Sequence, residues 1–469
     1  MTAAVPDPTA RTSTSARLRR VLGLPGLVLF GLVYLVPLTV FTTYGLVSLQ
    51  TGGRLPMAYC LTLAAMLFTA WSYAVMGKVF PAAGSAFSFA SNTFGASIGF
   101  LAGWALLLDY LFLPMINYLV IAIYLNTEFP TVPLWVFILG CIVLVSVLNV
   151  VGIKSIARAN FVVIAAQAVF IVVFFALSFR HLAGAGPVDL WAPFTGGHGY
   201  AAAGIDPAIG LAPLLAGAAV LCLSFLGFDA VSTMAEEASD PTRDIPRAVM
   251  FVTLGGGLLF VILAYVANLV LPRPTCLPAL DSACGFADNA SVDVMARAGG
   301  HFLSAFFVAA YCAGAFGSAF TSQASVSRIL YTMGRVGMLP HLFGALSARY
   351  GTPVLAILVV SALSLLAIWI DLGTLASMIS FGALVAFSAV NLSVIKHYLI
   401  DQRQRTGRAL LLYGMLPACG CALTAWLWTS LQAQSMIVGL AWLATGAAYL
   451  LIITRGLRRT PPAMELGDT

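Results

Sequence analysis

Charged residues are scarce in this chain of 469 residues. They make up 9% of it, against about 25% in soluble domains, while hydrophobic residues reach 61%. So little charge excludes a disordered chain, a collagen, a coiled coil and a secreted disulfide scaffold. What is left is a protein whose solvent is lipid.

Motifs for chemistry are also missing. There is no Walker motif, HExxH, nucleophile elbow, glycine-rich dinucleotide loop or CxxC pair, and the five histidines fall in loops or at helix ends. We therefore expect no enzyme, no catalytic residue, no metal and no cofactor. An ion gradient is the default energy source. The net charge of +6 does not call for a nucleic-acid partner, because basic residues beside membrane helices usually mark the cytoplasmic face.

Long apolar runs recur along the whole length, each able to cross about 30 Å of hydrocarbon as a helix. The runs do not alternate, so they favour helices over a barrel. We predict an all-α membrane protein with twelve transmembrane helices, at about residues 24–48, 56–77, 97–125, 132–151, 159–180, 211–235, 248–271, 302–328, 353–370, 374–396, 410–430 and 435–454.

The charge distribution supports this helix count. An even number of spans puts both termini on one side, and nineteen of the 23 basic residues then fall on that side. The basic side is expected to be cytoplasmic. We predict a cytoplasmic tail over 1–20, retained rather than cleaved, one transmembrane domain over 21–455 and a second cytoplasmic tail over 456–469.

Two cysteines lie together in a polar loop on the opposite, outer side. Cys276 and Cys284 could form a disulfide there, because that compartment is oxidising. Two free thiols are the equally open alternative.

The two halves of the chain resemble each other. Proline and glycine interrupt the first span near Pro37 and the sixth near Gly227, five helices later. Broken helices at matching positions are typical of an inverted-repeat transporter. We predict repeats over about 21–181 and 211–400, with the last two helices, about 410–454, outside them.

Two carboxylates lie near the middle of spans. Asp109 is in the third and Asp229 in the sixth, and a carboxylate at the bilayer centre costs roughly 2.5–3.5 kcal/mol. We interpret both as substrate-binding, with Asp229 the first candidate to carry a coupling proton and Asp109 the second. The alternative is a structural residue bonded to a neighbouring helix.

Other candidate site residues cluster at the breaks. Pro37 removes a backbone donor, and an interrupted helix leaves backbone groups free to face a ligand. Tyr110 shares a broad face of the third helix with Asp109. The aromatic residues beside the second break suggest a gate or a cation–π wall, with ordinary packing as the alternative. The predicted substrate-binding set is Pro37, Thr39, Thr42, Asp109, Tyr110, Phe225, Gly227, Phe228 and Asp229. A cytoplasmic latch is predicted from Glu236, Glu237 and Arg243.

Longer motifs bring a resemblance. The segments PLTVFTTYGLVS, FPAAGSAFSFA, GWALLLDYLFLPMIN, CLSFLGFDAVSTMAEEASDPTRDIPRA and SQASVSRILYTMGR are similar to those of the amino acid–polyamine–organocation permeases, and within them of bacterial putrescine importers. The resemblance implies twelve helices in a five-plus-five inverted repeat. It also implies a site at the breaks of the first and sixth helices and proton-driven uptake across the inner membrane.

One segment departs from that pattern. Where the importers are expected to read F-D-T-F-G, this chain has Thr42 in place of the aspartate. A diamine has two ammonium groups to balance, so an amino acid permease stays open as the alternative, as does exchange instead of symport. The expected partners are a small cationic or zwitterionic substrate, protons and the lipid bilayer.

Overall fold

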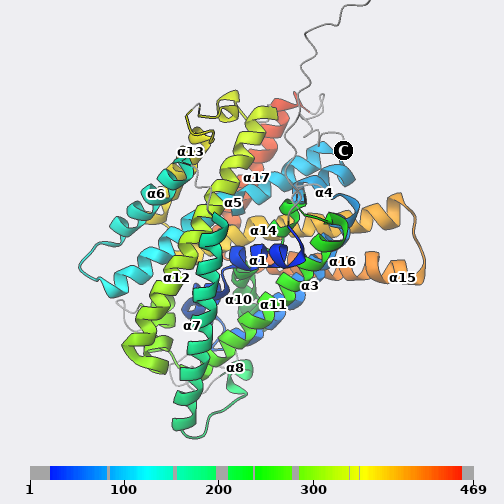
Figure 1. Ribbon diagram of the computed structural model, residues 1–469. Helices are drawn as coiled ribbons and strands as arrows, with labels where there is room; N and C mark the ends of the chain where they lie inside the picture. The colour runs from blue at the N-terminus through cyan, green and yellow to red at the C-terminus, as the bar shows by residue number, and fades with distance from the viewer. Residues whose placement is uncertain are drawn as a thin grey trace, which may run out of the picture.

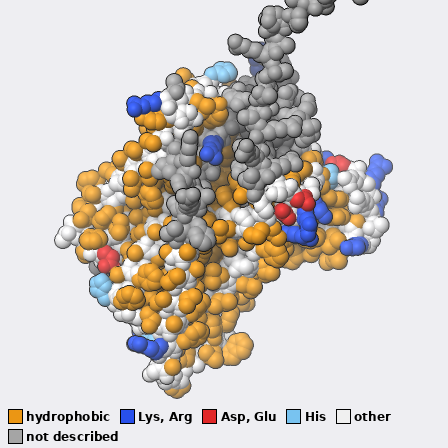
Figure 2. Space-filling model, in the orientation of Figure 1, with side chains coloured by type: hydrophobic (Ala, Val, Ile, Leu, Met, Phe, Trp, Pro, Cys, Tyr) orange, Lys and Arg blue, Asp and Glu red, His pale blue; other side chains and the backbone are white. Residues whose placement is uncertain are grey.

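The computed structural model describes residues 22–81, 85–151, 156–196, 210–235, 238–276, 285–336, 339–347 and 349–456. Within these ranges the chain is helical, and its only β-type pairing is an isolated bridge between Leu22 and Ala238. The expectation of an all-α protein is confirmed. Hydrophobic side chains cover most of the face shown in Figure 2, with charges gathered at its ends, as expected of a surface in contact with lipid.

Eleven helices in the described part are long and apolar enough to cross a membrane. The predicted span over 353–370 is a shorter apolar helix, Val354–Ile368. The helices are α1 (Leu24–Leu35) with η1 (Pro37–Phe41) and α2 (Tyr44–Gln50), α3 (Leu55–Val79), α4 (Ser85–Phe94), α5 (Ala96–Glu128), α6 (Leu134–Val151), α7 (Ile156–Gly184), α8 (Ala192–Thr195), α10 (Leu211–Leu221) with η2 (Cys222–Phe225) and η3 (Ala230–Met234), α11 (Pro241–Val270), α12 (Phe286–Val336), η4 (His341–Gly344), α13 (Val354–Ser364) with η5 (Leu365–Ile368), α14 (Leu372–Ile395) with η6 (Lys396–Asp401), α15 (Gly407–Ala409) with η7 (Leu410–Met415), α16 (Leu416–Thr429) and α17 (Ala433–Ile453).

Three segments differ from the sequence prediction. Helix α4 lies where we expected only a connection, and α12 begins sixteen residues before its predicted start, within a predicted loop. Gly300, with a positive φ of 65°, separates this first part of α12 from the membrane-spanning part. Helix α11 starts at Pro241, because Asp240 caps it by accepting a hydrogen bond from the Arg243 N–H at 3.2 Å. Hydropathy misses such segments, because short or polar helices carry little apolar signal.

Burial separates central from peripheral helices. In α5, 94% of the most apolar stretch is buried, against 17% in α17. Figure 1 shows α1 and α10 inside the bundle with α7 and α12 across them. Helix α5 packs on both α12 and α14. The interior is therefore built from the two broken helices and α5, α12 and α14, and any site between them is shielded from lipid.

A buried polar network joins α6, α12 and α13. The Gln323 side chain donates to Ser361 Oγ at 2.8 Å and accepts from Asn149 Nδ2 at 2.9 Å. Ser146 and Ser361 hydroxyls lie 2.6 Å apart. Each group is satisfied by another helix, so the network fixes these three helices to one another.

Replacing Gln323 by Leu is expected to lower thermal stability. The substitution removes a hydrogen-bond partner from Asn149 and Ser146 on α6 and from Ser361 on α13, at a cost of about 1–3 kcal/mol. Ser325→Ala is the control, because its hydroxyl bonds only within its own helix, to the Thr321 carbonyl at 2.9 Å. The melting temperature in detergent is the readout. Equal melting temperatures for the two variants would contradict a fixing role.

Candidate functional site

The first broken helix ends on a strained residue. Val36 has a φ of 52°, a left-handed conformation that β-branched residues rarely adopt. Pro37 follows and cannot donate a backbone hydrogen bond, so the chain continues as the short helix η1 before α2 begins at Tyr44. The break predicted at Pro37 is present. Strain of this kind persists only where surrounding packing enforces it, and it concentrates at functional sites.

The second broken helix passes directly against the first. Gly227 has a φ of 128°, and a Cβ atom there would lie 2.9 Å from Tyr34 Cδ1 and 3.0 Å from the Leu35 nitrogen. Both its conformation and its space require glycine. Asp229 Oδ1 accepts a hydrogen bond from the Gly227 N–H at 3.1 Å. The carboxylate therefore helps to hold the break in shape.

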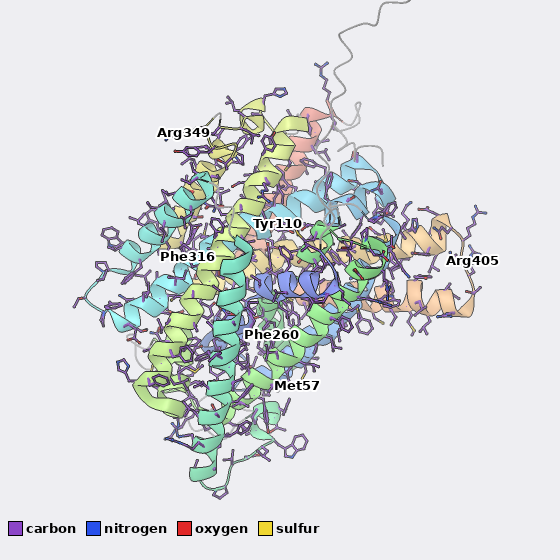
Figure 3. The ribbon with its side chains drawn as sticks, in the orientation of Figure 1. Met57, Tyr110, Phe260, Phe316, Arg349 and Arg405 are labelled. Carbon is purple, nitrogen blue, oxygen red and sulfur yellow. The ribbon has the colours of Figure 1, made fainter. Side chains whose placement is uncertain are left out.

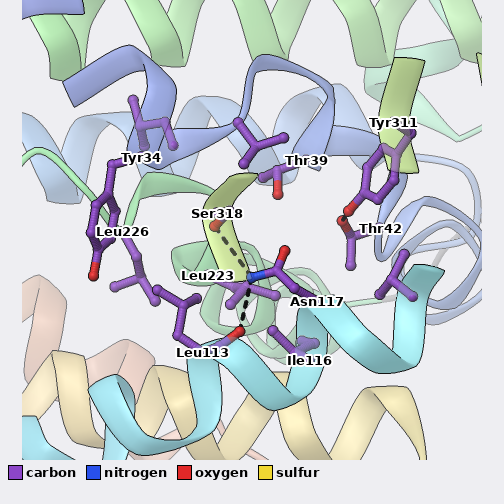
Figure 4. Close-up of a pocket in the computed structure, with 13 residues that line it drawn as sticks. Tyr34, Thr39, Thr42, Leu113, Ile116, Asn117, Leu223, Leu226, Tyr311 and Ser318 are labelled. Atoms are coloured by element: carbon purple, nitrogen blue, oxygen red, sulfur yellow. Dashed lines mark hydrogen bonds between the residues drawn. The ribbon is translucent and has the colours of Figure 1, made fainter. Parts of the chain in front are cut away.

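A small cavity lies where the two breaks meet α5 and α12 (Figure 4). Its lining contains hydroxyl, phenol and amide groups but no charged side chain. Of the predicted site residues it includes Thr39 and Thr42. Pro37, Asp109, Tyr110, Phe225, Gly227, Phe228 and Asp229 are not among the residues that line it. The lining consists of Tyr34, Leu35, Val36, Thr39, Thr42, Leu113, Ile116, Asn117, Val120, Leu223, Leu226, Tyr311 and Ser318.

Polar groups on the cavity wall are linked across helices. Asn117 Nδ2 donates to the Leu113 carbonyl at 2.8 Å and to Ser318 Oγ at 3.2 Å, as Figure 4 shows. The Thr42 hydroxyl is hydrogen-bonded to the Tyr311 hydroxyl. The Asn117–Ser318 and Thr42–Tyr311 hydrogen bonds join walls of the cavity to α12, so movement of α12 would change the cavity's shape.

An acidic cluster lies next to the cavity. Asp109 and Asp229 are 3% and 2% exposed, and they are close enough to interact electrostatically. Tyr34 lines the cavity and lies against Gly227, whose N–H is bound by Asp229, so it joins the cavity to the second break. Tyr110, central in Figure 3, lies near both carboxylates. Two buried acids and two buried phenols therefore lie near one another in the interior of the bundle.

The two carboxylates differ in how they are satisfied. Asp229 accepts the Gly227 N–H, whereas Asp109 Oδ1 is buried without a hydrogen-bond partner among the described residues. No lysine or arginine in the described ranges pairs with either, since the ion pair found there joins Lys396 to Asp401. A buried carboxylate without a cation needs a proton or a cationic ligand.

The two phenylalanines predicted for the site pack elsewhere. The Phe225 ring lies 5.5 Å from Phe260 on α11, and the Phe228 ring lies 5.2 Å from Phe387 and 5.5 Å from Tyr73. Both side chains are fully buried. In this conformation both rings pack against neighbouring helices, and their predicted role in substrate binding stays a prediction.

An aromatic cluster surrounds Phe41, the last residue of η1. The Phe41 ring lies 5.3 Å from Phe307 and 5.7 Å from Phe174. The Phe41 carbonyl accepts hydrogen bonds from the Tyr124 hydroxyl at 2.7 Å and the Ser291 hydroxyl at 2.6 Å. Ser291 belongs to the first part of α12, which sequence analysis did not predict. Its hydrogen bond to Phe41 therefore holds the first broken helix against α12.

Removing both donors with Tyr124→Phe and Ser291→Ala is expected to favour opening on the side of α2. In the closed state of the variant the Phe41 carbonyl has no hydrogen-bond partner, whereas in an open state it can bind water. The equilibrium should therefore shift toward the open state by about 1–3 kcal/mol, or roughly 5–150-fold in population. The readout is labelling of a cysteine placed at Thr42, in a background without native cysteines, by a membrane-impermeant maleimide. Thr195→Val, which removes an exposed hydroxyl of α8, is the control. Unchanged labelling would contradict a latch at Phe41.

The segment just before the start of the first helix is also hydrogen-bonded, to the segment that follows the second break. The Ser239 N–H donates to the Leu22 carbonyl at 2.9 Å, beside the bridge between Leu22 and Ala238. Arg243 is exposed and forms no ion pair with a described residue. Glu236 and Glu237 lie outside the described residues, so the latch that includes them stays a prediction.

The predicted disulfide is described on one side only. Cys276 is disulfide-bonded. Cys284 lies outside the described residues, and its pairing with Cys276 stays a prediction. Six cysteines within the described ranges, all in or beside apolar helices, are free.

Several cavity residues escaped the sequence analysis. Tyr34, Tyr311 and Ser318 had no local signal that separates them from packing residues. A phenol in the middle of an apolar helix was the one available hint, because a buried hydroxyl needs a partner.

Comparisons with known proteins agree with this architecture. The sequence profile of the family described as amino acid permease matches residues 26–452. The low-affinity putrescine importer PlaP of Escherichia coli K12 is 35% identical over 458 residues, covering 97% of this chain and 98% of its own. The branched-chain amino acid permease BcaP of Bacillus subtilis is 25% identical, covering 83% of each chain. The vacuolar cationic amino acid transporter 4 of Arabidopsis thaliana is 28% identical, covering 79% of this chain and 62% of its own.

A family match over almost the whole length, many apolar helices and a buried polar site at two helix breaks lead to one conclusion. The chain belongs to the amino acid permease family of the amino acid–polyamine–organocation superfamily, and it is a multi-pass membrane transporter of amines or amino acids, not an enzyme.

Proposed function

We propose that this protein is a proton-coupled importer of putrescine or a related amine in the bacterial inner membrane. The observation that carries the proposal is the pair of buried carboxylates, Asp109 and Asp229, which have no basic partner in the described ranges. Two acids in one low-dielectric site repel each other, so a cationic substrate and a proton are the natural counter-charges. The similarity to a putrescine importer supports the same substrate class.

The two acids have different roles in this proposal. Sequence analysis favoured Asp229 as the carrier of the coupling proton. The backbone N–H on Asp229 instead supports a fixed, ionised group that shapes the break and faces an ammonium. Asp109, with its unpartnered oxygen, exchanges the proton. An ammonium and a proton near the same acids then influence each other's binding, which is the coupling that symport requires.

The cavity takes the uncharged part of the substrate and its second polar end. Tyr34 connects cavity and acids, so an amine lying across it reaches both regions. Thr42 and Asn117 offer neutral hydrogen bonds to the second end of the substrate. Thr42 takes the position of the aspartate expected in putrescine importers. In this arrangement the Asp229 carboxylate binds one ammonium group, and neutral hydrogen-bonding side chains bind the other end of the substrate.

The membrane topology completes the proposal. Val354–Ile368 is 15 residues long and would span roughly 22 Å, so we propose it as a tilted or thinned twelfth crossing beside α6 and α12. Both termini are then cytoplasmic. The broken helices support an inverted repeat over about 21–181 and 211–400.

The second candidate function is amino acid permease, by symport or exchange. One observation favours it: the cavity lining has no charged side chain, while two broken helices lie beside it. Free backbone N–H groups at such breaks can hold a substrate carboxylate, and one aspartate would then suffice for the ammonium. The similarity to permeases of branched-chain and cationic amino acids fits this alternative.

Uptake of radiolabelled putrescine into proteoliposomes with an inward proton gradient tests the proposal. We expect accumulation that a protonophore abolishes and that diamines compete, while amino acids do not. Accumulation of an amino acid but not of putrescine would establish the second candidate. If putrescine only equilibrated across the membrane, at a rate independent of the proton gradient, proton coupling would be refuted but an amine would remain the substrate.

A further inference from the structure

The hairpin between α14 and α16 is rigid although it lies at the edge of the molecule (Figure 1). The rings of Tyr398 and Tyr413 stack with centroids 3.9 Å apart and planes 9° apart. The Gln404 N–H donates to the Tyr398 carbonyl, and the Gln402 N–H to the His397 carbonyl, both at 3.0 Å. The turn between the two arms is therefore held in one shape.

Three arginines occupy this turn. Arg403, Arg405 and Arg408 are exposed, and none forms an ion pair with a described residue, whereas Lys396 is neutralised by Asp401 at 2.9 Å. Arg403 has a φ of 53°, a conformation that non-glycine residues rarely adopt. The fixed turn thus presents uncompensated guanidinium groups, and guanidinium groups match phosphate geometry well.

Two of these arginines line a shallow, open hollow. It is lined by Leu399, Ile400, Arg403 and Arg405 and has a volume of about 470 Å³. Figure 3 labels Arg405 at the tip of the hairpin. Its apolar wall is Leu399 and Ile400, and the Ile400 side chain is 62% exposed. Two guanidinium groups and two apolar side chains thus share one amphipathic surface.

The length of the helix places the hollow relative to the bilayer. The helical segment Leu372–Asp401 has 30 residues and spans roughly 45 Å, which matches about 40–45 Å for a bilayer with its headgroups. The end that holds Leu399 and Ile400 therefore reaches the headgroup layer. The excess of basic residues marks this layer as the cytoplasmic one.

We propose that this hollow is a binding site for the headgroup of an anionic phospholipid, with the phosphate on Arg403 and Arg405 and the acyl chains along the hairpin. Membrane-facing basic pockets on the cytoplasmic side suit such headgroups. The apolar wall favours a lipid over a soluble phosphate, because a soluble anion gains nothing from the half-buried Leu399 and the exposed Ile400. The site does not depend on the identity of the transported substrate.

Native mass spectrometry of the detergent-purified full chain tests this site. The probes are phosphatidylglycerol and phosphatidylcholine with identical acyl chains. We expect the wild type to retain phosphatidylglycerol preferentially. The double variant Arg403→Ala/Arg405→Ala is expected to bind it about 30-fold more weakly, from roughly fivefold for each arginine near the surface. Arg455→Ala removes an exposed arginine at the end of α17 and serves as the control.

Each outcome decides the proposal. Retention of phosphatidylglycerol by the double variant at the level of Arg455→Ala would overturn it, as would equal retention of the two lipids by the wild type. Displacement of phosphatidylglycerol by millimolar inorganic phosphate would assign the hollow to a soluble anion instead. The melting temperature without added lipid checks folding, and Arg403→Lys/Arg405→Lys, which keeps the charge, is expected to restore most of the binding.

Discussion

Asp109→Asn is expected to abolish proton-driven accumulation of putrescine in proteoliposomes. The substitution keeps the size of the side chain but removes both its charge and its proton, at a site where Asp109 Oδ1 has no partner among the described residues. Because Asp229 is the acid that faces the ammonium in this proposal, Asp109→Asn should lose coupling while lowering substrate affinity less than Asp229→Asn does. Folding should survive, because asparagine has nearly the same size and Asp109 Oδ1 has no hydrogen-bond partner among the described residues to lose.

A second assay separates binding from coupling. Exchange of labelled for unlabelled putrescine needs no proton gradient, so a variant that exchanges at high substrate concentration but does not accumulate has lost coupling. Asp229→Asn is the matched variant, since its amide oxygen can still accept the Gly227 N–H and keep the break. It should remain sensitive to the proton gradient while binding substrate weakly. Wild-type accumulation by Asp109→Asn would refute the proposed role of Asp109.

Gly227→Ala is expected to inactivate the transporter and to destabilise it. A Cβ atom at this position would meet the Tyr34 ring at 2.9 Å and the Leu35 nitrogen at 3.0 Å, and the φ of 128° disfavours any side chain. The strain alone is worth about 1–3 kcal/mol. The first helix must also move away from the second break, which separates Tyr34 from the acids. We expect a lower melting temperature and loss of uptake.

The control lies on α11, where Gly255 is exposed and a Cβ atom would meet nothing within 4 Å. Gly255→Ala should leave uptake unchanged and stabilise slightly, by about 0.5–1 kcal/mol, since alanine loses less backbone freedom in a helix. If Gly227→Ala behaved like Gly255→Ala in both assays, close approach of the two breaks would not be essential to transport.

Sequence patterns were most informative where the signal is local. The spans were predicted to within a few residues for α5 and α17, because about twenty consecutive apolar residues have no other stable environment. Pro37 and Gly227 marked both breaks, because each residue changes what its own backbone can do. The helix α4 and the first part of α12 were missed, because neither has a long apolar run.

The site divides in the same way. Sequence alone determined that this chain is a membrane protein and that two of its helices are broken. It also determined that Asp109 and Asp229 lie in membrane helices, where a carboxylate raises the free energy of the protein and therefore indicates a function. Only the tertiary structure decided that the two acids lie together, that Tyr34 joins them to a cavity and that Phe225 and Phe228 face other helices. The physical reason is that hydropathy and backbone preference are properties of neighbours in the chain. Which side chains meet across helices depends instead on how each helix is rotated and how closely it packs, and that is set by contacts far apart in sequence.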